Sequence, residues 1–190
     1  MFALDLDELT PEQRSMVALW EAHLKAELQD KDAHASCDTM VANPYVNHVA
    51  VLTGGLGRRQ LENYYSRYFI PGQPSDLEIL PISRTVGRNR IVDEFVYRCT
   101  HSIPMEWLLP GVPPTGRRME IPVVVIVAFE GGKIESEQIY WDQASVLVQL
   151  GLLDPAGLPV AGVEIARKAL DRGSVPSNIL MKRTITDELL

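Results

Sequence analysis

The sequence predicts one α+β domain, in which helices come first along the chain and a run of antiparallel strands follows. Apolar residues recur at helical spacing before residue 72, whereas residues 76–141 are rich in β-branched and aromatic residues separated by Gly-containing turns. Residues 123–129 are apolar at every position, while a half-exposed antiparallel strand would alternate. Both faces of this strand must therefore be covered, and a strongly curved sheet wrapped around a pocket meets that requirement.

The first helix begins with a clear capping signal. Thr10 is placed as the N-cap, Pro11 occupies the first helical position, and Gln13 completes a capping box. One apolar stripe follows at helical spacing: Val17, Trp20, Leu24 and Leu28.

Two shorter helices are expected next. Asp30 or Asp32 caps the second, which carries Met40 and Val41 and ends at residues 43–44, because the residue before proline avoids the α region. Residues 44–52 are extended, and residues 53–57 form a turn into the third helix. That helix has an aromatic face and ends at residues 71–72.

Four strands are then predicted over residues 77–86, 91–102, 121–130 and 133–141, with turns at residues 87–90 and 131–132. A short helix follows from residue 142 to Leu150, and Gly151 ends it. We expect one domain over residues 1–154, and a C-terminal extension over residues 155–190 with a helix at 163–170 and an arm from 174.

Composition excludes several classes of protein. The 190 residues carry a net charge of −7 without a block of Lys or Arg, which argues against nucleic acid as a partner. The longest strongly apolar run, residues 123–129, is far shorter than the roughly 20 residues of a membrane span. The acidic N-terminus lacks the basic start of a signal peptide, and the two cysteines form no CxxC pair, so we expect a cytoplasmic protein.

Strand alternation selects the candidate reactive groups. Phe95, Tyr97 and His101 share one face of their strand, and Tyr140 and Asp142 share a face of the last strand, opposite Ile139 and Trp141. If both of these faces point inward, an aromatic interior holds a carboxylate and an imidazole near its rim. An apolar environment raises the pKa of a carboxyl group, which suits general acid-base catalysis near neutral pH.

Structural roles compete with these functional ones. Asp142 begins a helix and can serve as its N-cap, where the anionic form is favoured. His101, at a strand end, can be structural. His23 and His34 lie on helices without a clustered acidic or thiol partner, so we predict no metal site. The chain also lacks the GxSxG, GxGxxG and GxxxxGK[ST] motifs, and we predict no cofactor.

Four segments in the C-terminal half carry a family resemblance. They are Cys99-Thr100-His101, the loop at residues 111–117, the hairpin at residues 129–135, and Tyr140-Trp141-Asp142 followed by Gln149-Leu150-Gly151. In this order they resemble the SnoaL-like polyketide cyclase family of the nuclear transport factor 2-like superfamily. The resemblance covers residues 35–153. Cys99 stands where the family usually has Gly, and the segment at residues 105–109 is bulkier than the family linker.

The resemblance implies a cone-shaped α+β barrel that encloses a hydrophobic pocket, closed by the N-terminal helices. In the characterised cyclases an acidic residue on the last strand is the general acid-base in an intramolecular aldol ring closure, without metal or organic cofactor. That residue corresponds to Asp142, and the family's motif histidine to His101; His48 lies where the family often has a histidine. Such barrels commonly pair through the open sheet face, so a homodimer is expected.

We therefore expect an enzyme that acts on a small hydrophobic carbonyl compound by aldol-type cyclisation or isomerisation. Asp142 removes a proton α to the carbonyl, His101 stabilises the enolate oxygen, and His48 helps to close the pocket mouth. The residues expected to bind substrate are Tyr45, Phe95, Tyr97, Trp107 and Tyr140.

Two alternatives stay open. One is a non-catalytic module for ligand binding or dimerisation, which a capping role for Asp142 would favour. The other is a hydrolase of epoxides or lactones, which needs a second buried carboxylate or an Arg that positions water. Asp93 is in phase with His101 but lies nearer the start of the strand.

Overall fold

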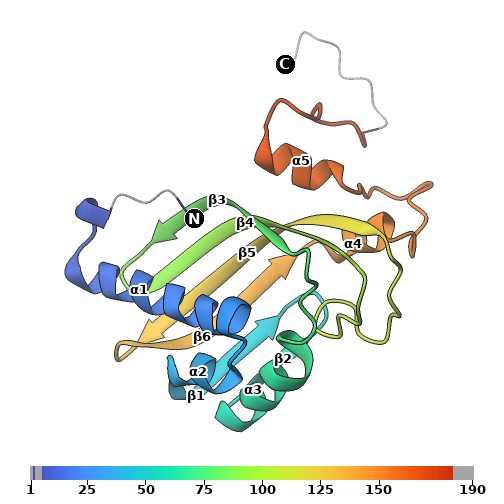
Figure 1. The fold of residues 1–190 in the computed structure, drawn as a ribbon. Coiled ribbons are helices and arrows are strands. Elements are labelled where there is room, and N and C mark those ends of the chain that lie inside the picture. The colour runs from blue at the N-terminus through green and yellow to red at the C-terminus, as the bar shows by residue number, and fades with distance from the viewer. Residues whose placement is uncertain (1, 3–5, 182–190) are drawn as a thin grey trace.

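The computed structural model of the chain describes residues 2 and 6–181 (Figure 1). Its helices are η1 (Leu6–Glu8), α1 (Pro11–Lys25), η2 (Ala26–Asp30), α2 (Ala33–Asp38), α3 (Arg58–Tyr64), η3 (Tyr65–Phe69), α4 (Gln143–Gln149) and α5 (Glu164–Leu170). Its strands are β1 (Met40–His48), β2 (Thr53–Leu56), β3 (Glu78–Val86), β4 (Arg90–Thr100), β5 (Arg118–Glu130) and β6 (Lys133–Trp141). The predicted α+β class is confirmed.

One curved six-stranded sheet organises the molecule, in the order β2-β1-β6-β5-β4-β3. Every neighbouring pair is antiparallel except β1 and β6, which run parallel. In Figure 1, α1 crosses in front of the sheet, and α2 and α3 lie beside β1. The sheet is not closed, because β2 and β3 are free edges. The expectation of a barrel was wrong in this respect.

The N-terminal helix is built as its sequence predicts. The Thr10 hydroxyl accepts from the Gln13 amide at 3.2 Å, and the Gln13 side chain accepts from the Thr10 amide at 2.9 Å. Such a cap stabilises a helix by about 1 kcal/mol. Gln13 also donates to the carbonyls of Val86 and Gly87, which ties the start of α1 to the end of β3.

Two expectations for residues 40–57 were wrong. Met40 and Val41 do not continue the second helix, because β1 already starts at Met40, which pairs with Ile134 of β6. Residues 53–56 form strand β2 rather than a turn. Gly54 allows the pairing with β1: its φ is +132°, and a Cβ atom there would lie 2.1 Å from the Val46 carbonyl oxygen.

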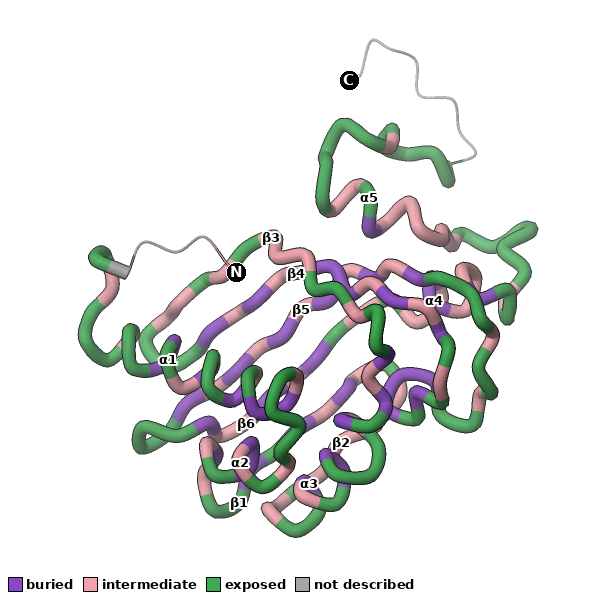
Figure 2. The backbone as a smooth tube through the Cα atoms, viewed as in Figure 1, coloured by how far each residue is buried: buried purple, intermediate pink, exposed green. Residues whose placement is uncertain are grey.

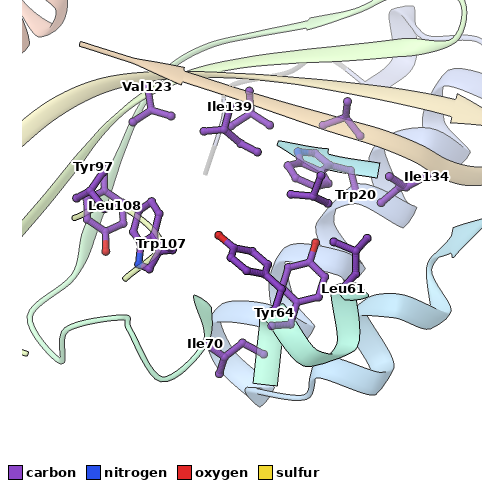
Figure 3. Packing of buried hydrophobic residues seen from close by; sticks show 14 of the residues in the cluster. Trp20, Leu61, Tyr64, Ile70, Tyr97, Trp107, Leu108, Val123, Ile134 and Ile139 are labelled. Atoms are coloured by element: carbon purple, nitrogen blue, oxygen red, sulfur yellow. The ribbon is translucent and has the colours of Figure 1, made fainter. Parts of the chain in front are cut away.

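The core lies between the concave face of the sheet and the helices that cover it. Buried and half-buried residues alternate along β4 and β5 (Figure 2), so one face of each strand is closed off and the other is partly open. In the close view of Figure 3, Val123 and Ile139 project from the sheet on the side of Trp107 and Tyr64. The inner face of residues 123–129 is buried, but the outer face is only half-buried, so the expectation that both faces are covered was wrong for the outer face.

Beyond the strands, α4 and α5 follow closely the predicted positions. Gln149 of α4 exchanges hydrogen bonds with the backbone of Glu120 at 2.9 Å, and α5 packs against β4 and β5. The end of the expected C-terminal arm, residues 182–190, lies outside the described residues. None of the described helices combines the length and apolar character that a bilayer span requires.

Candidate functional site

A partly open cavity of about 110 Å³ lies between the concave face of the sheet and the helical layer. Its wall is mostly apolar and aromatic, with contributions from α1, η3, the central strands and the loop that carries Trp107. The polar side chains on the wall are few, and they include Glu27, His48, Asp93 and Glu137. A mostly apolar cavity with a few convergent polar groups is the usual form of a small-molecule site.

The structure places four of the expected site residues on this wall: His48, Phe95, Tyr97 and Trp107. Tyr97 donates to the Gln73 side chain at 2.8 Å, and the Trp107 indole donates to the Gly72 carbonyl at 3.1 Å. These bonds fix the two rings on the wall. Their contact with a ligand stays a prediction.

Tyr140 and Asp142 lie outside the cavity, because the opposite face of β6 points inward. Trp141 pairs with Val123 and Ile139 with Val125, and directly paired residues project from the same face of a sheet. Val123, Val125, Ile139 and Trp141 all line the cavity. Tyr140, on the opposite face of the strand, is 39% exposed. The inward placement considered for Tyr140 and Asp142 was therefore wrong.

Asp142 is the N-cap of α4. Its Oδ1 accepts from the amides of Ala144 at 2.9 Å and Ser145 at 3.2 Å. Asp142 is exposed, and its carboxylate accepts these two hydrogen bonds at the surface of the domain. This is the capping alternative, and it removes Asp142 from contact with anything inside the cavity.

His101 and Tyr45 are also absent from the cavity wall. His101 is fully buried, with Nδ1 beside the Thr115 hydroxyl at 3.2 Å, and its Nε2 has no partner among the described residues. Tyr45 is 37% exposed on β1. The structure thus separates His101 and Asp142 from the cavity that holds the other candidates.

A second set of reactive groups takes their place at the cavity wall. His23 Nε2 lies 3.0 Å from Glu27 Oε1 and 3.1 Å from Glu137 Oε1, and all three side chains are at least 95% buried. Glu27 and Glu137 both line the cavity. Tyr65 O–H donates to Glu137 at 3.4 Å. We call His23, Glu27 and Glu137 the carboxylate-histidine cluster.

The donors and acceptors around His23 require an additional proton in this cluster. Thr39 donates its hydroxyl hydrogen to the Ser36 carbonyl at 2.6 Å, so its oxygen accepts from His23 Nδ1–H at 2.7 Å. With a hydrogen on Nδ1, the neutral ring would present the bare Nε2 to two carboxylate oxygens, and three acceptors would meet without a donor. A further proton on His23, Glu27 or Glu137 resolves this conflict.

The pKa values of His23 and Glu27 are both raised, for different physical reasons. Burial alone would lower the pKa of His23, but attraction to Glu27 and Glu137 outweighs it and raises that pKa well above its ordinary value. Burial raises the pKa of Glu27 despite the neighbouring His23. Both shifts favour the protonated forms, so the cluster retains its proton near neutral pH.

The sequence contained one signal for this cluster. Glu27 follows His23 by four residues and therefore lies on the same side of the helix. The statement that His23 and His34 lack acidic partners was wrong for both, because His34 likewise pairs with Asp38 at 3.2 Å. Glu137 could be found only through the fold, since 110 residues of chain separate it from Glu27.

The cluster is also the place where the described side chains come closest to a metal-binding arrangement. Its three potential ligand atoms lie within 4.8 Å of one another. The hydrogen-bond distances from His23 Nε2 to the two carboxylates are part of this closeness.

At another part of the wall, His48 sits in a box of aromatic rings. The rings of Tyr64, Phe69, Trp107 and Trp141 lie 5.3–5.8 Å from it, centroid to centroid. Its Nδ1 is 3.0 Å from the Tyr64 hydroxyl, and the ring also hydrogen-bonds to the backbone of Thr53. Burial lowers the pKa of His48 to about 4, so the ring is neutral at pH 7.

Comparison with known proteins agrees with this architecture. The SnoaL-like polyketide cyclase family profile matches residues 18–150. No curated protein matches the chain. Among solved structures, a Jannaschia sp. CCS1 protein classed with the SnoaL-like polyketide cyclases has a TM-score of 0.62 at 18% identity, over 80% of this chain and 100% of its own.

Two further structures are similar at the level of the fold. TsrD from Streptomyces laurentii has a TM-score of 0.58 at 20% identity, over 77% of this chain and 100% of its own. A Catenulispora acidiphila DSM 44928 protein with a ketosteroid isomerase-like fold has a TM-score of 0.52 at 20% identity, over 76% and 96% of the two chains. Together with the helices and curved sheet described above, the profile match shows that the chain belongs to the SnoaL-like polyketide cyclase family.

Proposed function

We propose that this protein is a cyclase or isomerase that removes a proton α to the carbonyl of a hydrophobic compound, with Glu137 as the base. The observation that carries the proposal is the buried carboxylate-histidine cluster on the wall of an apolar cavity. Two carboxyl groups around one imidazole supply both a proton acceptor and a proton donor. This assigns the acid-base role expected of Asp142 to a different part of the same strand.

The two carboxyl groups have different surroundings, which supports a division of labour. Glu137 on β6 accepts from Tyr65 O–H at 3.4 Å and lies 3.1 Å from His23 Nε2. Glu27 is the buried carboxyl with the raised pKa. In the proposed reaction Glu137 takes the α proton, and the proton held by Glu27 and His23 is available for the product.

His48 is suited to stabilise the enolate that forms. If Tyr64 O–H donates to His48 Nδ1, the neutral ring carries its hydrogen on Nε2 and can offer this N–H to a ligand at the cavity wall. A neutral N–H donor in an aromatic enclosure stabilises a developing oxyanion, since little water competes for it. The charge of the enolate then passes to a second carbonyl in ring closure, or to another carbon in isomerisation.

Exchange of α hydrogen for deuterium tests the proposal without knowledge of the natural substrate. The protein is incubated in D2O at pH 7 with small cyclic ketones such as 2-indanone, and loss of the α-proton signal is followed by NMR. We expect Glu137→Gln to slow enzyme-dependent exchange by about 10² or more, the usual contribution of a general base. Asp142→Asn is the matched control, and it should exchange at the wild-type rate.

Two results would contradict this assignment. Wild-type exchange in Glu137→Gln would exclude Glu137 as the base, and loss of exchange in Asp142→Asn alone would restore Asp142. The capping role of Asp142 is the observation that favours the rival, a non-catalytic binding module. Ketone binding that quenches tryptophan fluorescence, without any exchange in the wild type, would support that rival.

A further inference from the structure

Asp93, on β4, is a buried carboxylate that the proposed reaction does not use. It is 1% exposed, and Arg84 holds both its oxygens, with Nε–Oδ1 and Nη2–Oδ2 distances of 2.7 Å. Arg84 also donates to Glu21 of α1 at 3.1 Å. The carboxylate is therefore paired with a cation and fixed in position on the sheet.

The same carboxylate orients a tryptophan of the covering helix. The Trp20 indole N–H donates to Asp93 Oδ2 at 2.8 Å. One turn further along α1, the His23 ring stacks on Trp20, with ring centroids 5.4 Å apart and planes inclined by 17°. An unbroken series of contacts thus runs from Arg84 through Asp93 and Trp20 to the ring at the centre of the carboxylate-histidine cluster.

We propose that Asp93 is a positioning residue, which acts through the indole of Trp20 to hold the His23 ring and its proton between Glu27 and Glu137. This inference rests on the proposed function, because it assigns a purpose to the orientation of His23 in that cluster. An indole stacked within about 6 Å of a cationic ring attracts it through its π electrons, and the attraction grows when water is excluded. The Asp93 bond fixes the plane of the indole and increases its electron density.

A simple tether between helix and sheet would not produce this effect. Gln13 also ties α1 to β3, through the carbonyls of Val86 and Gly87, but it lies two turns before Trp20 and touches no member of the cluster. Loss of the Gln13 tether weakens helix docking without altering the ring that stacks on His23. It therefore provides the matched control for the Asp93–Trp20 contact.

The test is the titration of the His23 imidazole, followed by NMR in the full chain. The groups that face this ring are Glu27, Glu137 of β6, Tyr65 of η3, Ser36 of α2, and Thr39 at the C-cap of α2. Trp20→Phe leaves all of these in place and keeps a smaller aromatic ring beside His23, but it removes the N–H that bonds to Asp93. We expect it to lower the His23 midpoint by about half a pH unit to one unit, and Gln13→Ala to leave it unchanged.

An unchanged midpoint in folded Trp20→Phe would overturn the proposal, as would an equal shift in Gln13→Ala. If Trp20→Phe does not fold, Asp93→Asn replaces it, with the Trp20 indole proton as a second signal. A lower His23 midpoint together with a displaced indole resonance supports the proposal, and no change in either overturns it. Failure of the proposed function is seen separately, as wild-type ketone exchange in Glu137→Gln.

Discussion

The neutral His48 ring makes a quantitative prediction for the pH dependence of stability. Burial in its aromatic box lowers the pKa of His48 from 6.5 to about 4. Between these two values the unfolded chain binds a proton at this position that the folded chain does not, so the free energy of unfolding falls as the pH falls. The stabilisation is fully present above pH 6.5 and is lost progressively as the pH approaches 4.

The size of the effect follows from the shift. A difference of 2.5 pKa units corresponds to a limit of about 3 kcal/mol, and about 2.5 kcal/mol of it is lost by pH 4.5. His48→Gln removes the titrating group and retains an acceptor for the Tyr64 hydroxyl. The wild type should therefore lose about 2.5 kcal/mol more than this variant between pH 7.5 and 4.5.

Urea unfolding at a series of pH values measures this difference directly. Titrations of His23 and Glu27 are common to both proteins and cancel when the two curves are subtracted. A subtracted curve that is flat to within about 0.5 kcal/mol would refute the reasoning. NMR titration of His48 in the wild type provides an independent check, since a midpoint near 6.5 would contradict the lowered pKa of this ring directly.

Three further outcomes test the architecture. Asp142→Ala should lower the free energy of unfolding by about 1 kcal/mol through loss of the α4 cap, and leave ketone exchange in place; a loss of exchange would contradict the capping role. Gly54→Ala should cost about 1–3 kcal/mol in urea unfolding, because its φ of +132° and its contact with Val46 leave no room for a side chain; an unchanged midpoint would argue against the β1–β2 pairing. Ile126, half-buried on the outer face of β5, is proposed to lie in a homodimer contact, so Ile126→Lys should convert a dimer to a monomer in size-exclusion chromatography with light scattering, and a variant of unchanged mass would exclude that contact.

Local sequence was sufficient wherever neighbours along the chain decide the structure. The capping box at Thr10, the hairpin turn at residues 131–132, and β6 over Lys133–Trp141 all appear where the sequence predicts them. Met40 was misplaced because a strand that pairs with distant β6 competes there with a helix, and tertiary pairing overrides local preference.

The candidate site likewise has some features that the sequence predicts and others that depend on tertiary pairing. The fold family and the aromatic character of the cavity wall were accessible from residue types and their order, and His48 was found through the family resemblance. The choice between Asp142 and Glu137 was not, because a strand offers two faces and only its pairing with β5 turns Glu137 inward. Sequence alone determined a helix-covered sheet around an apolar interior, while the tertiary structure decided which charged groups enter that interior, since only packing brings His23, Glu27 and Glu137 within hydrogen-bond distance.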